Sequence, residues 1–423
     1  MSANAKPLSE LISVEGLYKA KVRIKGVAEH TPLMFNHNLS EHFGCRILLK
    51  REDLQVVRSY KIRGAYNMMA GMGKEALKNG IVCASAGNHA QGVAFACHKL
   101  KVKGKIFMPE VTPKQKVNKV KLFGKEHVEI ILFGDTFDDA NTRALAEAET
   151  QNMVFVPPFD HRKIIEGQGT VGLEILEDCP DIIDYLFLPI GGGGLISGVG
   201  SCFKQLSPDT KIIGVEPEGA PAMKRSLEAG ENIILDKIDS FVDGAAVRQV
   251  GKHTLAIAQK VVDDIILVPE GKVCSTILQL YNEEGIVVEP AGALTIAALD
   301  FYADKIKGKN VVCVLSGSNN DITRTQEIRE RSLFYEGLKH YFVIKFPQRA
   351  GALRDFLNDV LGPTDDITHF EYTKKHNREA GPALVGIQVQ KKEDYEGLIA
   401  RMEAHKINYQ TLNDQKMLFD LLV

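Results

Sequence analysis

The sequence carries no excess of charge of one sign, and it has no long apolar run. Its 52 lysines and arginines nearly balance 54 aspartates and glutamates, which leaves a net charge of −2. This balance gives no electrostatic reason to expect a nucleic acid or an anionic membrane as a partner. No stretch of 18 apolar residues occurs, and residues 1–16 lack the basic and apolar segments of a signal peptide. We therefore expect a cytoplasmic protein that does not cross a membrane.

The sequence has few cysteines, and none of them lies in a Cys-x-x-Cys pair. The seven cysteines are scattered without a Cys-x-x-Cys motif, and most of them lie in apolar runs. Such a distribution supports neither a zinc site nor a disulfide framework, and it is typical of reduced thiols that pack as small hydrophobic groups. No metal site is predicted. The chain also lacks a fixed-period repeat and any low-complexity tract.

What the sequence does contain is enough apolar material for two or three domains, since 44% of its 423 residues are hydrophobic. From residue 81 to about residue 330, short apolar runs alternate with amphipathic segments, as in βαβ units. Continuous Ile, Val and Leu runs belong in parallel sheets that are buried on both faces. We predict an α/β region of two doubly wound lobes within residues 1–330, with the smaller lobe at about 60–160 and a cleft near the strand carboxyl ends.

Three elements are expected before the βαβ units begin. Residues 8–30 show apolar positions at helical spacing and are predicted to form a helix that ends before Pro32. Residues 45–49 are predicted to form a strand, and a further helix is expected from Gly64 to about Met72.

The composition changes after residue 320. Residues 322–339 are highly charged and are predicted to form a solvent-exposed connecting helix that includes a linker at 331–338. Residues 339–423 then follow the order strand, helix, strand, strand, helix, strand, with the second strand at 366–375. This order predicts an α+β ferredoxin-like module, in which two helices cover one face of an antiparallel sheet.

Lys61 is the candidate catalytic residue. It lies in the segment Ser-Tyr-Lys-Ile-Arg-Gly-Ala, which we predict to be a turn of small and polar residues before an apolar run. A lysine becomes a catalyst when its surroundings lower its pKa or when it forms an imine with a carbonyl cofactor. Most lysines are solvated surface charges, so the assignment depends on the other motifs.

The second motif is a turn that follows an apolar strand and opens a helix. It contains Ser85, Ala86, Gly87, Asn88 and His89. Backbone N–H groups at such a helix start suit an anion, and a substrate carboxylate fits there. The Asn88 amide both donates and accepts hydrogen bonds, which suits a phenolic oxygen. The alternative is a turn that merely caps the helix.

The third motif is the run Gly191, Gly192, Gly193 and Gly194, which is followed by Leu195 and lies between an apolar strand and a helix. Four glycines lose much backbone entropy on folding, a cost that is tolerated where the backbone must approach something closely. A phosphate monoester is the natural candidate at a strand–loop–helix junction. The alternative is a flexible linker. Neither a Walker A lysine nor a dinucleotide fingerprint accompanies the run.

Two further motifs end in polar side chains. Ser316 follows the apolar strand Val-Val-Cys-Val-Leu, where its hydroxyl could bond a ring nitrogen or could cap the next helix. Glu289 precedes Pro-Ala-Gly-Ala on a turn into a helix, where capping is at least as good an interpretation as function.

A lysine, an Asn-bearing anion turn, a glycine loop and a strand-end serine are together what pyridoxal 5′-phosphate requires. The motifs SYKIRGAYN, SAGNHAQG, GGGGL, EPAGA and VLSGSN, in this order, resemble those of threonine dehydratases (threonine deaminases), which are pyridoxal-phosphate enzymes of fold type II, the tryptophan synthase β-like fold. The resemblance covers about residues 20–330. Tyr60 stands where phenylalanine is commoner in the family.

The resemblance implies a role for each motif. Lys61 would form the imine with the cofactor and act as the base at Cα, and Asn88 would contact the cofactor's 3′-oxygen. The glycines from 191 to 194, with Leu195, would surround the phosphate, and Ser316 would face the pyridine nitrogen. The turn from Ser85 to His89 would hold the substrate carboxylate. The implied reaction is the α,β-elimination of L-threonine to 2-oxobutanoate and ammonia, the first step of isoleucine biosynthesis, with L-serine as a further substrate.

The C-terminal module at about 339–413 resembles the ACT-like regulatory domain of biosynthetic threonine dehydratases, particularly in FPQRAGALRDFLNDVLG. Only one copy fits, whereas longer members of the family carry two. The resemblance implies isoleucine as an effector, with valine as its antagonist. Feedback enzymes are usually symmetric oligomers, so a homodimer or homotetramer is expected.

Three rival functions are considered. Serine racemase shares the fold, but racemases carry a serine base where this chain has Ala86. A β-replacement synthase is disfavoured because the motifs around Lys61 and Asn88 are of the dehydratase type. A non-catalytic amino-acid sensor would place the function in the C-terminal module, but the complete set of cofactor motifs argues against it.

Overall fold

The computed structural model describes residues 11–372 and 379–413. The chain divides into two compact units. The first unit comprises the residues up to 270 together with residues 280–321, and the second comprises residues 271–279 and the chain from residue 322 onward.

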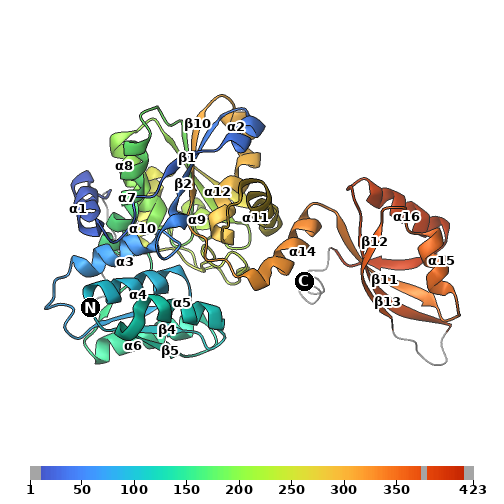
Figure 1. The fold of residues 1–423 in the computed structure, drawn as a ribbon, viewed down its shortest axis with the longest axis horizontal. Coiled ribbons are helices and arrows are strands. Elements are labelled where there is room, and N and C mark those ends of the chain that lie inside the picture. Colours follow the sequence, from blue (N-terminus) through green and yellow to red (C-terminus); the bar gives the residue numbers. More distant parts are fainter. Residues whose placement is uncertain (1–10, 373–378, 414–423) are drawn as a thin grey trace. The chain divides into compact units, whose positions relative to one another are not determined.

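A six-stranded sheet forms the centre of the larger lobe of the first unit (Figure 1). Its strands, in spatial order, are β1 (Leu33–Phe35), β2 (Arg46–Arg51), β10 (Asn310–Leu315), β7 (Tyr185–Pro189), β8 (Lys211–Pro217) and β9 (Asp264–Val268). All neighbouring pairs are parallel except β1 and β2, which are antiparallel. Strands β7, β8 and β10 are buried along almost their whole length, as expected for a parallel sheet with both faces covered.

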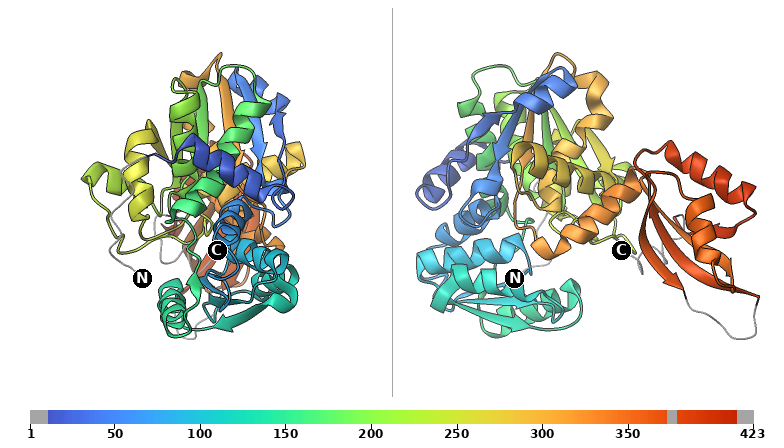
Figure 2. Two further views of the ribbon diagram at one scale, coloured as in Figure 1. Left: turned by 90° about the vertical axis from the view of Figure 1, so that its left-hand side faces the viewer. Right: turned by 45° about the vertical axis from the view of Figure 1, so that its right-hand side comes forward.

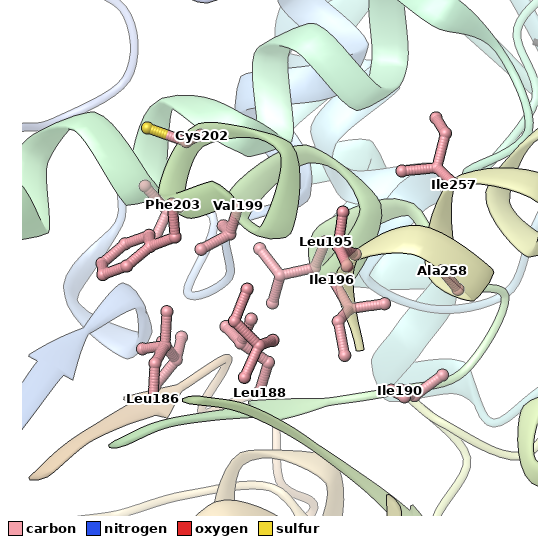
Figure 3. Packing of buried hydrophobic residues seen from close by; sticks show 14 of the residues in the cluster. Leu186, Leu188, Ile190, Leu195, Ile196, Val199, Cys202, Phe203, Ile257 and Ala258 are labelled. Atoms are coloured by element: carbon pink, nitrogen blue, oxygen red, sulfur yellow. The ribbon is translucent and has the colours of Figure 1, made fainter. Parts of the chain in front are cut away.

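Helices cover both faces of this sheet (Figure 1). Helices α7 (Arg162–Asp178), α8 (Gly194–Leu206) and α10 (Lys252–Val261) lie on one face, and α12 (Pro290–Ala297) packs on β7, β8 and β10 from the other. Leu186 and Leu188 of β7 point toward Leu195 and Val199 of α8 (Figure 3). This apolar contact fixes the helix that begins at the glycine run.

Further helices belong to this lobe, in whole or in part. They are α1 (Val14–Ile24), α2 (His37–Phe43), α9 (Ala222–Ala229), α11 (Glu270–Glu284), which spans both units, and α13 (Ala303–Ile306), with 3₁₀ turns at Glu52–Leu54 and Leu299–Tyr302. The predicted helix over 8–30 is wrong in length. Its start is fixed by Ser13, whose side chain accepts the Gly16 N–H, and residues 8–10 lie outside the described residues. Its end comes at Ile24, after which Lys25 and Ala28 form an isolated bridge.

The smaller lobe has a parallel sheet whose two faces carry different cores. Its strands are, in order, β5 (Val128–Leu132), β4 (Gly104–Met108), β3 (Ile81–Ala84) and β6 (Val154–Phe155). Helices α3 (Lys61–Ala70), α4 (Asn88–Leu100) and α5 (Lys114–Gly124) lie on one side and α6 (Phe137–Thr150) on the other (Figure 1). Alternate β3 residues face the two sides, so Cys83 packs with α4 and Val82 with α6. The predicted doubly wound α/β lobes are thus confirmed.

The second unit contains the charged helix and the C-terminal module. Helix α14 (Thr325–Tyr335) is shorter than the predicted 322–339, because a 3₁₀ turn (Ile322–Arg324) precedes it and a strand begins at Lys339. The module runs β11 (Lys339–Pro347), α15 (Ala352–Asp359), β12 (Asp366–Tyr372), β13 (Ala380–Gln388), α16 (Asp394–Ala404) and β14 (Asn408–Thr411). Residues 373–375 of the predicted strand lie outside the described residues.

The C-terminal sheet is antiparallel, in the order β12-β13-β11-β14. Phe356 of α15 and Leu398 of α16 share one apolar cluster with Phe342 and Val385 of the sheet, and both helices cover the same face (Figure 2). The predicted ferredoxin-like module is confirmed.

The lengths of the helices and the burial of the cysteines can be compared with the predictions from the sequence. Among the described residues, none of the helices combines the length and the apolar character needed to span a lipid bilayer. All seven cysteines are buried and none of them forms a disulfide, as expected for thiols that pack as hydrophobic groups.

Candidate active site

Lys61 is the first residue of helix α3 and is partly buried. The prediction of a turn that reaches Gly64 is wrong, because Tyr60 already has helical dihedral angles and α3 begins three residues earlier. The Lys61 Nζ donates a 3.3 Å hydrogen bond to the carbonyl of Pro158 and lies 5.5 Å from the centroid of the Tyr60 ring. Burial lowers the pKa of Lys61 to about 8, although the charge of Glu289 acts in the opposite direction. A neutral amine is therefore accessible near physiological pH.

The segment before Lys61 runs beside the end of strand β10. The Tyr60 N–H donates to the Ser316 carbonyl at 3.3 Å, and Ser59 forms an antiparallel bridge with Gly317. Ser316 is buried, and its Oγ donates to the carbonyl of Ala291 at 3.3 Å. Ser316 and Lys61 are thus close in space, although they lie 255 residues apart in the sequence.

Gln168 connects the glycine run with Lys61. The Pro158 carbonyl that accepts from Lys61 also accepts a hydrogen bond from Gln168 Nε2 at 3.4 Å. The other end of this amide lies against Gly194, where an added Cβ would collide with Oε1. Lys61 and the start of α8 are therefore joined by one carbonyl and one side chain.

Packing alone already requires glycine at two positions of the run. A Cβ at Gly192 would overlap the Phe159 ring, and a Cβ at Gly193 would lie 2.9 Å from Cβ of Thr254. Gly193 also has a φ of 91°, a conformation that side chains strain. No side chain of the described residues caps α8, so the N–H groups of its first turn remain open to an anion. Leu195, by contrast, is buried in the core below.

The turn before α4 has a similar open helix start. Gly87 is the N-cap, and none of the described side chains caps the helix. The Ser85 Oγ accepts the Gly87 N–H at 3.2 Å, and a Cβ at Gly87 would meet nothing within 4 Å. Ala86 packs at the edge of the small-lobe core. The His89 ring is buried with Nε2 at 2.9 Å from the Val156 carbonyl. Burial and the charge of Lys61 lower the pKa of His89 to about 3, so its ring is neutral.

The Asn88 amide is fixed by two residues that the sequence interpretation did not combine. Asn88 Nδ2 donates to Glu289 Oε1 at 2.6 Å, and Asn88 Oδ1 accepts from Asn319 Nδ2 at 2.7 Å. The Asn319 N–H completes the ring by donating to Glu289 Oε2 at 3.2 Å. These contacts allow only one orientation of the Asn88 amide. Its second Nδ2 hydrogen has no partner among the described residues, so it is free for a ligand.

Glu289 is a buried carboxyl with an unusual titration. Burial and the negative charge of Asp243 raise the pKa of Glu289 to about 7, against the hydrogen bonds from Asn88 and Asn319. Both motifs that supply these partners were visible in the sequence, but nothing in it shows that Glu289 and Asn319 meet Asn88. The Lys119 Nζ donates to Asn319 Oδ1 at 3.0 Å, but no sequence motif points to Lys119 as a residue of the site.

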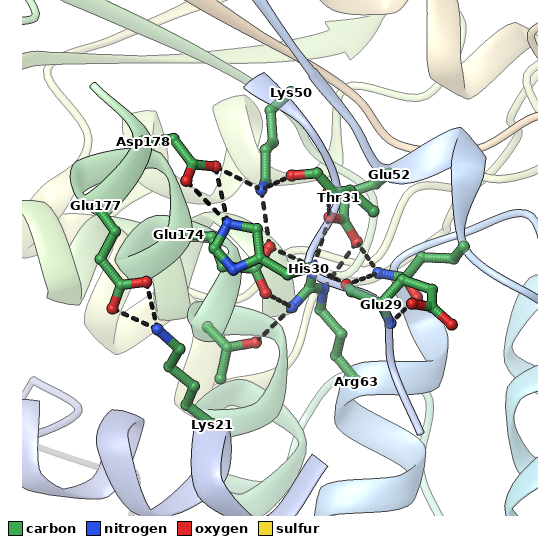
Figure 4. Close-up of polar contacts among 12 residues, drawn as sticks. Lys21, Glu29, His30, Thr31, Lys50, Glu52, Arg63, Glu174, Glu177 and Asp178 are labelled. Carbon is green, nitrogen blue, oxygen red and sulfur yellow. Dashed lines mark hydrogen bonds and ion pairs between the residues drawn. The ribbon is translucent and has the colours of Figure 1, made fainter. Parts of the chain in front are cut away.

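A buried ionic network surrounds Arg63 (Figure 4), which lies two residues after Lys61 in α3. Arg63 has no exposed surface; its guanidinium donates to Glu52 at 2.7 and 2.8 Å and to Glu174 at 2.6 and 2.8 Å. Lys50, also fully buried, donates to Glu174 at 2.7 Å and to the Thr31 carbonyl. Burial opposes the charge on Arg63, but the two carboxylates outweigh it and raise its pKa. This network anchors the start of α3, where Lys61 lies.

Comparisons with known proteins agree with this arrangement. The family model described as "Pyridoxal-phosphate dependent enzyme" matches residues 24–317, and that described as "C-terminal regulatory domain of Threonine dehydratase" matches residues 330–422. The chain is 60% identical to "L-threonine dehydratase biosynthetic IlvA" of Halalkalibacterium halodurans over 97% of this chain and 99% of that protein.

Solved structures show the same likeness. Threonine deaminase isoform 2 from Solanum lycopersicum, in its processed form, is 40% identical with a TM-score of 0.71, and the match covers 78% of this chain and 99% of that one. Serine racemase from Dictyostelium discoideum is 31% identical with a TM-score of 0.68, covering 74% and 99%. The full-length match and the regulatory module distinguish between these two: the chain belongs to the biosynthetic threonine dehydratases, a family of pyridoxal-phosphate-dependent enzymes.

Proposed function

We propose that this chain, in the cytoplasm, converts L-threonine to 2-oxobutanoate and ammonia, the first step of isoleucine biosynthesis, and deaminates L-serine in the same way. The observation that carries the proposal is a lysine of lowered pKa at the point where the Asn88 turn, the glycine run and Ser316 meet. The buried thiols, which form no disulfide, fit a reducing compartment.

The residues around Lys61 fit pyridoxal 5′-phosphate. Ser59 Oγ is buried and has no partner among the described residues, and the N–H groups of the first turn of α8 are uncapped. We assign the phosphate to the backbone from Gly191 to Leu195, the ring hydroxyl to the free Asn88 hydrogen and the ring nitrogen to Ser316. Lys61 would hold the carbonyl carbon of the cofactor. When bound, the cofactor withdraws electrons from the substrate Cα and so makes its proton acidic.

The chain's own groups then supply binding and proton transfer. The open start of α4, from Ser85 to His89, receives the substrate carboxylate; His89 contributes its backbone, since its ring is bonded to Val156. The Lys61 amine takes the Cα proton because burial keeps much of it neutral near pH 8. Loss of the β-hydroxyl leaves an enamine that hydrolyses in water to 2-oxobutanoate and ammonia.

Racemisation is the reaction to be distinguished, given the likeness to a serine racemase. It requires a second group that returns a proton to the opposite side of Cα. Ala86 has no such group, since its side chain is a methyl that packs at the small-lobe core. We therefore expect D-serine formation to be negligible beside deamination; a comparable rate of D-serine production from L-serine would contradict the assignment.

We further propose that residues 1–330 form the catalytic domain, 331–338 a linker and 339–423 a regulatory domain that binds isoleucine, with valine as its antagonist, in a homodimer or homotetramer. The expected result is 2-oxobutanoate production from L-threonine that isoleucine lowers and valine restores. Initial rates with each amino acid, together with the mass by light scattering, test both parts. Rapid turnover that ignores isoleucine would refute the regulatory assignment and leave the catalytic one intact.

Glu289→Gln tests the clamp on Asn88, which consists of the hydrogen bonds that join the Asn88 amide, Glu289 and Asn319. A carboxylate accepts from both Asn88 Nδ2 and the Asn319 N–H, whereas a glutamine offers one acceptor and confronts the other donor with an NH₂ group. Loss of one charge-assisted hydrogen bond corresponds to about a tenfold fall in kcat/KM. Cofactor affinity, measured by equilibrium dialysis, should fall with it.

The matched control is Glu284→Gln, since Glu284 also accepts hydrogen bonds from two asparagine amides, those of Asn36 and Asn38 at 2.8 Å. Its partners lie at the start of α2 rather than beside Lys61, so kcat/KM and cofactor affinity should stay unchanged. Equal effects of the two substitutions would count against a role for the clamp.

A further inference from the structure

A cluster of two imidazoles and a carboxylate lies on the small lobe, apart from Lys61. His98 lies in the last turn of α4, and Glu126 and His127 lie in the 3₁₀ turn Lys125–His127 between α5 and β5. One ligand atom from each of the three residues lies within 4.8 Å of the others. The two imidazole rings are edge to face, with centroids 5.3 Å apart.

The Nδ1 atoms of the two histidines form no hydrogen bond with the described residues. Nδ1 of His98 and Nδ1 of His127 are both shielded from solvent, and neither has a hydrogen-bond partner among the described residues. The His127 Nδ1 lies 3.3 Å from Glu126 Oε1 without forming a hydrogen bond. Buried nitrogens without partners are uncommon, because the loss of water is not compensated. Two such atoms in one cluster with a carboxylate need an explanation.

We propose that His98, Glu126 and His127 form a binding site for a divalent transition-metal ion of the zinc class.

The donor set matches such an ion. Two imidazole nitrogens and one carboxylate oxygen, with water in a fourth position, are a common ligand set of Zn²⁺, and imidazole also suits Ni²⁺ and Cu²⁺. Metal–nitrogen distances are about 2.0 to 2.1 Å, so the three side chains would close slightly on the ion. The Glu126 side chain is 70% exposed and free to turn toward it.

The surroundings set limits on affinity. Lys101 and Lys125 are near enough to lower the pKa of His98, after the larger effect of desolvation. Neutral imidazole is the form that binds metal, but the same lysines repel a cation. Binding weaker than at a closed four-ligand zinc site is expected.

The site would join two elements without disturbing the reaction. Ten residues of α4 separate His98 from Asn88, about 15 Å at 1.5 Å per residue. A bound ion would tie the far end of α4 to the turn before β5, and so stabilise the small lobe. The effect should therefore be on unfolding rather than on the rate of 2-oxobutanoate formation.

In the experiment, the holoenzyme is titrated with ZnCl₂. Isothermal titration calorimetry and competition with a chromogenic chelator measure the number of ions bound per chain and their affinity. The expected result is one ion per chain in the wild type. His98→Ala and His127→Gln should each weaken binding at least about tenfold, since even outer-shell changes cost 10- to 100-fold. The control is His37→Ala, because His37 pairs with Glu41 on the surface without a second imidazole. Zn²⁺ should raise the melting temperature of the wild type and the control only.

Two further readouts keep the outcome decisive. X-ray absorption at the zinc edge should show only nitrogen and oxygen ligands, whereas a sulfur shell near 2.3 Å would assign the ion to a cysteine and overturn the proposal. Absence of binding to wild type, or equal binding by wild type and the folded His127→Gln variant, would also overturn it. None of these results depends on the assignment of the reaction at Lys61.

Discussion

Lys61→Ala is expected to abolish 2-oxobutanoate formation, with a fall in kcat/KM of about 10³-fold or more. The Lys61 amine is the only neutral base that the proposal places at Cα, and it is also the group that would hold the cofactor. The variant should lose the absorbance of the enzyme-bound cofactor as well as the activity. Steady-state rates and an absorbance spectrum of the purified protein check both effects.

Stability separates a lost catalyst from a lost fold. Burial disfavours the ammonium form of Lys61, as its lowered pKa shows, so the cofactor-free variant should melt at the same temperature as the cofactor-free wild type or slightly higher. Lys74→Ala serves as the control, since Lys74 is an exposed residue of the same lobe and should behave as wild type. Ordinary turnover by the Lys61→Ala protein would overturn the central assignment.

Arg63→Met should be the most destabilising of the substitutions considered. It leaves Glu52 and Glu174 buried without their main counter-charge, and breaking one side of a buried ion pair costs about 3–5 kcal/mol. Urea unfolding followed by circular dichroism measures the loss. Because Arg63 anchors the start of α3, residual folded protein should also bind the cofactor more weakly.

The comparison that gives this result its meaning is Arg143→Met. Arg143 pairs with Glu147 at 3.5 Å, but it is 49% exposed, and surface pairs contribute little. No measurable change is expected there. Adding Glu52→Gln to Arg63→Met should recover part of the lost stability, since Arg63 is the cation that pairs with Glu52, whereas Glu174 keeps Lys50 as a partner. If Arg63→Met unfolds at the same urea concentration as wild type, the network does not anchor α3.

The elements with strong periodicity could be predicted from the sequence, because a buried parallel strand leaves a continuous apolar run. Element ends were less predictable. Two of the first three residues of α3, Lys61 and Arg63, are charged, and no side-chain cap marks its start, so the sequence pattern predicts a helix that begins after Lys61 rather than at it. Residues 25–30 continue an apolar pattern, but they form a bridge instead of extending α1.

Within the site, the sequence identified residues but not their partners. Asn88, Glu289 and Asn319 each stand in a motif of small residues, yet their mutual hydrogen bonds join positions about 200 residues apart. Arg63 and Lys50 were beyond prediction for a different reason. Charged residues are expected at the surface unless they are paired, and their pairing depends on α7, whose Glu174 gives no local sign of it.

The position of β2 in the large sheet has a consequence for how the chain folds as it is synthesised. β2 has β1 on one side and β10 on the other, and β10 leaves the ribosome about 260 residues later. At about 5–20 residues per second, this edge of β2 waits on the order of 13 to 50 s for its partner. The small-lobe sheet, whose strands lie between them in the chain, is synthesised within that interval. We infer that the small lobe folds first and that an exposed apolar β2 edge is the point at which the nascent chain is most prone to aggregate.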